Sequence, residues 1–152
     1  MKRVALLLLP FAAACASLSG AGSGTGAPSP NAAIQQFLSA ARQKDLTAMA
    51  AVWGTVKGPA SKSMPTKELE RRELIMIQCL SHEKATIGAS TPGEAGRLRI
   101  PVELVLLTQK ATPAFTVVRG PSNRWYVENF EIDQMRDHGF CGATTAPPGG
   151  TR

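Results

Sequence analysis

The spacing of hydrophobic residues follows a helical period in the first part of the chain. Within 30–53 and 66–82, apolar residues recur three and four positions apart, which places them on one face of a helix. The first segment contains Ile34, Phe37, Leu38 and Ala41 and then Leu46, Met49, Ala50 and Trp53; the second contains Leu69, Met76, Ile77 and Leu80. The pattern predicts two helices within 30–53, with N-caps at Ser29 or Asn31 and at Asp45. It predicts a longer third helix over 66–80, with Thr66 as its cap.

From residue 84 onward the pattern changes to alternation, which is typical of strands with one buried face. A short strand is expected in 84–90 and a long one in 97–107. The segments "AFTVVRG" and "RWYVENFEID" flank the turn "GPSN" and predict a hairpin. Trp125 and Val127 have one parity, whereas Phe130 and Ile132 have the other. A β-bulge near Glu128 and Asn129 would bring all four to the same face.

Three helices followed by about four antiparallel strands predict an α+β domain over 30–141, with the helices packed on a curved sheet. The paired helices at 30–53, the helix at 66–80 and the closing "VVRGPSNRWYVENFEI" resemble the nuclear-transport-factor-two-like superfamily, also grouped as cystatin-like, and particularly its small bacterial envelope lipoproteins. The resemblance implies a cone-shaped domain that binds a small apolar ligand in its cavity or a protein partner on its open sheet face. It also implies a homodimer formed through that sheet.

The amino-terminal sequence is typical of an export signal. "MKR" and the apolar run "VALLLLPFAAA" predict a signal peptide over 1–14, too short to span a membrane. Ala12 and Ala14 suit ordinary signal peptidase, but a cut before Cys15 also resembles the bacterial lipoprotein signal, in which that cysteine is acylated. We expect a lipidated Cys15, a flexible tether over 15–29 and a disordered tail over 142–152. Ala16, where aspartate would retain a lipoprotein at the inner membrane, implies outer-membrane anchoring facing the periplasm.

The remaining two cysteines and both histidines stand in mirrored tetrapeptides. "CLSH" contains Cys79 and His82, and "HGFC" contains His138 and Cys141. Two thiolates and two imidazoles could bind zinc tetrahedrally. An exported chain instead favours a disulfide, and lipidation of Cys15 leaves one even pair. The expectation is a Cys79–Cys141 disulfide, with no metal and no cofactor.

A set of apolar and aromatic residues can be interpreted either as core or as the lining of a hydrophobic cavity, and periodicity marks burial first. This set comprises Phe37, Trp53, Met76, Leu80, Phe115, Tyr126 and Phe130. An enzyme would need acids and bases inside the cone, and Tyr126, Glu128, Asp133 and His82 are the groups at hand. Nothing in the sequence points these four inward. We therefore expect a non-enzymatic binding protein, with an isomerase- or lyase-like enzyme as the alternative.

Charge excludes one class of partner. The net charge is +6, and removing Lys2 and Arg3 with the leader leaves 6 − 2, or about +4. These charges are scattered, and apart from Arg71-Arg72 there is no basic run. Nucleic-acid binding requires a basic stripe with exposed aromatic side chains. No nucleic-acid partner is expected; the expected partners are the membrane, through the lipid, and an envelope protein or apolar ligand.

Overall fold

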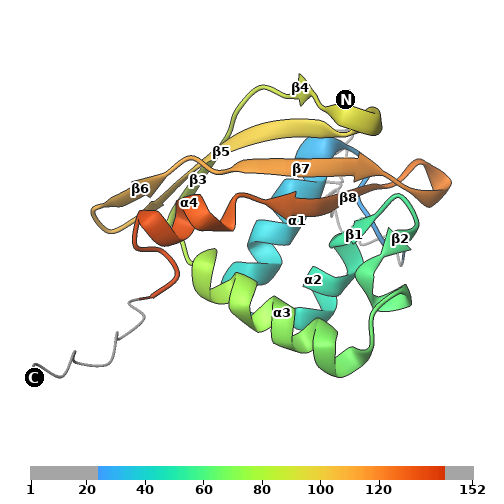
Figure 1. Ribbon diagram of the computed structural model, residues 1–152, viewed down its shortest axis with the longest axis horizontal. Coiled ribbons are helices and arrows are strands. Elements are labelled where there is room, and N and C mark those ends of the chain that lie inside the picture. Colours follow the sequence, from blue (N-terminus) through green and yellow to red (C-terminus); the bar gives the residue numbers. More distant parts are fainter. Residues whose placement is uncertain (1–23, 143–152) are drawn as a thin grey trace, which may run out of the picture.

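The computed structural model describes residues 24–142 and shows an antiparallel sheet with helices against one face (Figure 1). The α+β class is confirmed. Within the described residues there are four α-helices, α1 (Pro30–Gln43), α2 (Leu46–Val52), α3 (Thr66–Cys79) and α4 (Ile132–Asp137). The prediction of three helices, all before the sheet, is incomplete because α4 follows the last strand. No helix in this part of the chain is long and apolar enough to cross a membrane.

Two of the three predicted helix caps are confirmed. The Ser29 hydroxyl accepts a hydrogen bond from the Ala32 amide at 3.2 Å, and the Asp45 carboxylate accepts one from the Ala48 amide at 2.9 Å. Each bond satisfies an amide that has no partner inside its helix. The third cap is wrong: Thr66 is the first helical residue of α3, and Pro65 precedes it without a capping side chain.

The sheet has six strands where about four were expected. Its order is β3-β5-β7-β8, and β4 and β6 also pair with β5. The bounds are β3 (Lys84–Ile87), β4 (Thr91–Pro92), β5 (Leu98–Leu106), β6 (Gln109–Ala111), β7 (Ala114–Arg119) and β8 (Trp125–Phe130). The two unexpected strands have two and three residues, which is too short for alternation to appear in the sequence. They exist because the nine-residue β5 offers both of its edges for pairing.

The predicted bulge lies in β8. Thr116 pairs with Asn129 and Val117 pairs with Val127, so Glu128 is left without an opposite residue. Phe130, Val127 and Trp125 therefore pair with Phe115, Val117 and Arg119, alternate residues of β7, so these three share one face as predicted. Ile132, the fourth residue of the predicted set, lies in α4 and not in the strand. The predicted strand over 124–133 nevertheless extends too far. β8 ends at Phe130, and α4 follows it immediately.

The segment between α2 and α3 contains a small hairpin. β1 (Gly54–Thr55) and β2 (Gly58–Pro59) form a two-stranded sheet, and a 3-10 helix, η1 (Ala60–Lys62), follows. A side chain at Gly54 would place its Cβ 2.3 Å from the carbonyl oxygen of Gly58. Glycine therefore allows the two backbones to approach each other here. The glycines and prolines of this segment are typical of a loop, and here they form a tight turn.

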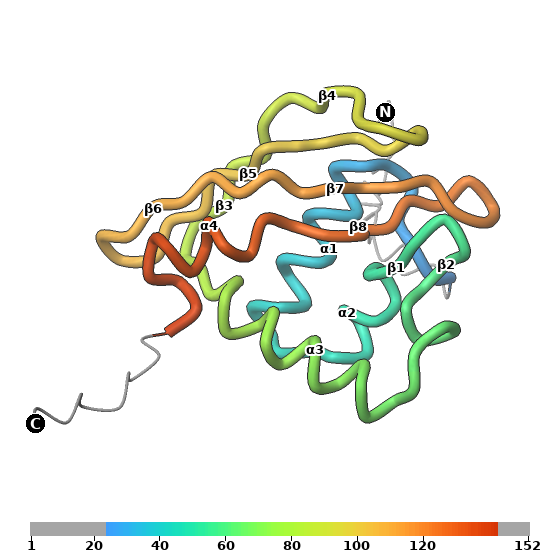
Figure 2. Tube along the Cα trace, in the orientation of Figure 1, coloured from blue at the N-terminus to red at the C-terminus, as the bar shows by residue number. Residues whose placement is uncertain are grey.

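Residues 24–29, which the sequence analysis assigned to the tether, lie against the domain. Ala27 is buried and exchanges two backbone hydrogen bonds with Trp125, each 2.8 Å long. The Arg124 side chain donates to the Gly26 carbonyl at 2.6 Å. The ordered domain therefore includes residues before Pro30, as the trace in Figure 2 shows. Residues 15–23 of the predicted tether, Cys15 among them, and 143–152 of the predicted tail lie outside the described residues.

Candidate functional site

Three of the predicted lining residues pack against one another between α1 and the sheet. The rings of Phe37, Phe115 and Phe130 are buried. The Phe115 and Phe130 centroids lie 5.4 Å apart, and each lies 6.4 Å from the Phe37 centroid. These are the distances of aromatic pairs in contact. The three rings therefore fill the space between α1 and the sheet.

The other four predicted lining residues also belong to packed regions. Met76 and Leu80 are buried, and Trp53 packs against the core while its indole N–H donates to the Glu128 carbonyl at 3.4 Å. The Tyr126 hydroxyl lies 3.1 Å from the Thr25 hydroxyl. Of the seven, Tyr126 alone borders any of the surface hollows considered below. Their arrangement is that of a core.

The four acid–base candidates are each engaged with a different partner. Glu128 forms a bidentate ion pair with Arg97, and Asp133 accepts from Arg136 at 2.6 Å. The His82 ring Nδ1 lies 2.7 Å from the Leu80 carbonyl. Within residues 24–142 the structure forms no hydrogen bond between any two of the four.

The Sγ atoms of Cys79 and Cys141 lie 2.18 Å apart, at disulfide distance, as the sequence predicted. The pair joins the end of α3 to the segment that follows α4, 62 residues later. The two histidines of the mirrored tetrapeptides do not complete a metal-ligand set with it. In the described part of the chain, no three His, Cys, Asp or Glu side chains converge as metal ligands would.

A surface groove runs between α1, α3 and the segment after α4, and we call it the α1–α3 groove. Its volume is about 870 Å³. Its apolar lining consists of Leu74, Ile77, Leu106, Phe140 and Cys141. Leu74 is 54% exposed, so its side chain is accessible to a partner in the groove.

The charges of the α1–α3 groove have one sign. Arg42 and Lys44 line it at the end of α1, and no acidic residue is among its lining residues. The groove therefore combines an apolar floor with a positive rim. This combination suits an occupant that has apolar and acidic groups side by side.

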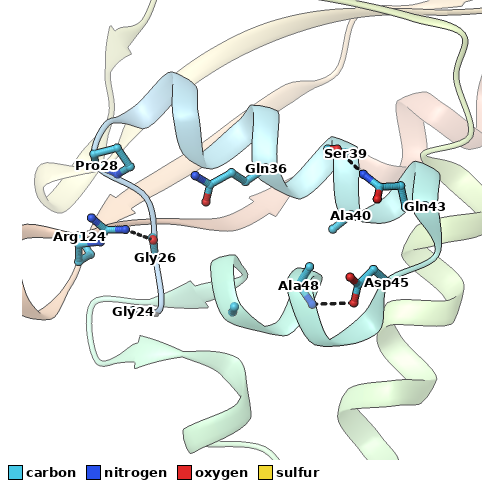
Figure 3. A pocket seen from close by; sticks show the side chains of 11 residues that line it. Gly24, Gly26, Pro28, Gln36, Ser39, Ala40, Gln43, Asp45, Ala48 and Arg124 are labelled. Carbon is cyan, nitrogen blue, oxygen red and sulfur yellow. Dashed lines mark hydrogen bonds between the residues drawn. The ribbon is translucent and has the colours of Figure 1, made fainter. Parts of the chain in front are cut away.

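A second cleft, of about 500 Å³, lies between α1, α2 and residues 24–28 (Figure 3). Its polar side chains are used within the protein. Gln43 donates to Ser39 at 2.7 Å, Asp45 caps α2, and Arg124 holds the Gly26 carbonyl. Gln36 alone among the polar side chains drawn in Figure 3 has no partner there. Arg124 thus holds residues 24–28 to the start of β8, and the Gly26 amide donates to the Ala51 carbonyl of α2 at 2.7 Å, so these contacts have a structural role.

Glu73 is the most unusual polar residue of the domain, and the sequence did not single it out. Glu73 is 1% exposed, and its Oε1 has no hydrogen-bond partner among the described residues. Burial, reinforced by the negative charge of Glu70, raises the pKa of Glu73 to about 7. A signal was present: Leu69, Glu73, Met76 and Leu80 occupy one helical stripe, and Glu73 stands where an apolar residue is expected.

Comparison with protein-family models, with curated proteins and with solved structures finds no significant match for this chain. The resemblance to the nuclear-transport-factor-two-like superfamily therefore stays a prediction based on element order and on one strand. The function has to be argued from the surfaces of the domain itself.

Proposed function

We propose that this chain is a non-enzymatic, lipid-anchored protein of the bacterial cell envelope that binds a protein partner in the α1–α3 groove. The observation that carries the proposal is the groove itself, in which exposed Leu74 lies beside Arg42 and Lys44 with no acidic residue in the lining. Its proposed occupant is a peptide segment in which an apolar side chain is followed closely by acidic ones. Apolar burial would supply affinity, and the two cations would set orientation.

The packed interior supports this choice over a ligand in the cone. Phe37, Phe115 and Phe130 contact one another where such a ligand would bind. The open face of the sheet is a weaker candidate for the partner site, or for a homodimer. Its charged side chains pair within the chain, Arg99 with Glu131 at 2.6 Å and Lys110 with Glu103 at 2.7 Å.

The anchor would keep the groove near the membrane. Gly24, the first residue that the structure describes, lies nine positions after Cys15 (24 − 15). An extended chain of that length spans at most about 30 Å. A domain held so close to the bilayer meets other envelope proteins at high effective concentration, so a modest affinity is sufficient for binding.

Neighbouring side chains on α3 provide a matched test. Leu74 lines the groove and is 54% exposed, whereas Ile75 does not line it and is 50% exposed. A photo-crosslinking residue placed at position 74 of the anchored chain should yield one defined adduct in cells, and the same residue at position 75 should not. The crosslinked peptide is then identified by mass spectrometry, synthesised and titrated into the purified protein.

The proposal requires that this peptide contain acidic and apolar residues. Leu74→Asp should weaken its binding at least about tenfold, because it removes apolar contact and adds a like charge. Ile75→Asp should leave the affinity unchanged. The proposal is wrong if positions 74 and 75 give the same adducts, if the adduct at 74 is a lipid, or if both aspartate variants bind the peptide like the unmodified chain.

A further inference from the structure

A separate hollow lies between α2 and α3, which pack side by side (Figure 1), and we call it the α2–α3 hollow. Its volume is about 350 Å³, suitable for a small molecule. The walls are largely apolar and include Leu46, Ala50 and Leu69. Glu73 and Glu70 are the acidic residues among its lining, and no basic residue lines it.

The packing of α2 against α3 does not explain why a glutamate occupies position 73. Its side chain lies in the buried stripe of α3 and borders the hollow, and its Oε1 has no partner among the described residues. A buried polar atom without a hydrogen bond destabilises the fold, and a leucine would fit the same stripe. Glu73 lines the hollow and the fold does not use its Oε1, so its carboxylate is suited to accept a hydrogen bond from a ligand.

The charges of the surrounding elements do not neutralise Glu73. From α3 itself, Glu70 adds a second negative charge that favours the protonated form of Glu73. The residues of α2 are uncharged, and Thr25 and Ser61 present hydroxyl groups to the hollow.

The other charged side chains near α3 lie elsewhere. Lys62, next to Ser61, borders a different hollow, and Arg42 of α1 lines the α1–α3 groove. In α4, Asp133 and Arg136 pair with each other at 2.6 Å. On α3 itself, Arg71 and Arg72 pair with Glu68, and Lys67 is not among the residues that line the hollow. The lining is therefore negative when Glu73 is ionised, because it contains two carboxylates and no basic side chain.

We propose that the α2–α3 hollow binds a small organic cation, an amine with a compact apolar body. The ammonium group would donate a hydrogen bond to the Glu73 carboxylate and lie near Glu70, while the apolar body would contact Leu46, Ala50 and Leu69. An anion is repelled by the two carboxylates. A hard metal ion needs six or more oxygen ligands, which apolar walls do not supply. This site is independent of the α1–α3 groove and does not rest on the function proposed for it.

The test uses cyclohexylammonium as the probe and cyclohexanol as its neutral counterpart, titrated into the purified full chain by calorimetry at pH 6 and pH 8. Both probes have the same ring, so the difference between them reports the charge. The amine should bind with a stoichiometry of one, and more tightly than the alcohol. Its affinity should rise about tenfold from pH 6 to pH 8 as Glu73 ionises, because alkylamines stay protonated over this range.

Two variants separate Glu73 from general charge. Glu73→Gln, which keeps the shape of the side chain, should lower the affinity for the amine at least about tenfold at pH 8 and remove its pH dependence. Glu83→Gln, at an exposed position outside the hollow, should change neither. In the unmodified chain, NMR titration of the Glu73 carboxyl carbon should show a lower pKa with the amine than without it.

The proposal fails if the amine and the alcohol bind equally, if neither binds at millimolar concentration, or if Glu73→Gln keeps the affinity of the unmodified chain. It also fails if the titration of the Glu73 carboxyl is unchanged by the amine. The NMR measurement needs no variant, so a folding defect in Glu73→Gln would not obscure the result.

Discussion

At the scale of single residues, Glu73 makes the stability of the domain depend on pH. Its carboxyl group ionises near pH 4.5 in the unfolded chain, whereas burial raises the pKa to about 7 in the folded chain. Between these values the unfolded state binds fewer protons than the folded state. The free energy of unfolding therefore falls as pH rises from about 4.5 to about 7, and this effect is complete above pH 7.

We predict that Glu73→Gln removes this slope. The unmodified chain should lose at most about 3 kcal/mol between pH 4.5 and pH 7.5 through this group, since one pKa unit corresponds to about 1.4 kcal/mol. Urea unfolding of both chains at pH 5, 6, 7 and 8 gives the difference curve, in which the other carboxyl groups cancel. The same slope in both chains would contradict the burial of an ionisable Glu73.

The burial of a carboxyl group is also difficult to predict from the sequence. The apolar members of the α3 stripe, Leu69, Met76 and Leu80, follow from the helical period and are buried as expected. The position of Glu73 in this stripe indicates burial, but a charged residue is also typical of the solvated face of a helix. Its burial depends on α2 lying against that position, which is a tertiary contact that no local pattern contains.

At the scale of elements, the Cys79–Cys141 pair holds the C-terminal segment against α3. That segment contains α4 and the buried Phe140, and it provides part of the α1–α3 groove. A disulfide with a separation of 62 residues stabilises the fold by about 4 kcal/mol in the chain-entropy model, because it restricts the unfolded chain.

We predict that the double variant Cys79→Ser/Cys141→Ser loses about 2 to 4 kcal/mol of unfolding free energy, measured by urea denaturation. Reduction of the unmodified chain should lower its stability by a similar amount and raise its intact mass by about 2 Da. The double variant serves as the control, because reductant should not affect it. If chelator, and not reductant, destabilises the unmodified chain, the pair is part of a metal site instead.

Elements with several residues of one period were predictable, whereas α4 and the strands of two or three residues were not. The helices α1 and α3, the strand β5 and the β7–β8 hairpin follow from their apolar spacing. The helix α4 has six residues, and its start, "EID", continues the alternation of β8 in the sequence. The bulge at Glu128 was predictable because apolar residues at odd positions, Trp125 and Val127, and at an even position, Phe130, had to lie on the same buried face. The α1–α3 groove was not, because it forms only when residues from α1, α3 and the C-terminal segment come together.

At the scale of the whole molecule, the first described residues leave the domain at a defined place. Thr25 contacts Tyr126, and Arg124 holds Gly26, so the first described residues are attached to β8 and to the residue before it. Two hydrogen bonds between Ala27 and Trp125 strengthen this attachment. If Cys15 carries the proposed lipid, we expect its removal to leave the stability of the domain unchanged, because these contacts all lie after residue 23.

We predict that Cys15→Ser releases the protein from the membrane and leaves its unfolding free energy unchanged. The variant lacks the thiol to which a lipid would be attached, and position 15 precedes the first contact of the described domain. Cell fractionation should find the unmodified chain in the membrane fraction and the variant in the soluble one. The double variant Cys79→Ser/Cys141→Ser is the control, because it should stay in the membrane fraction although it also lacks cysteines. An unmodified chain whose intact mass shows no acyl addition would instead indicate cleavage by ordinary signal peptidase, since secretion of the folded domain requires only the leader.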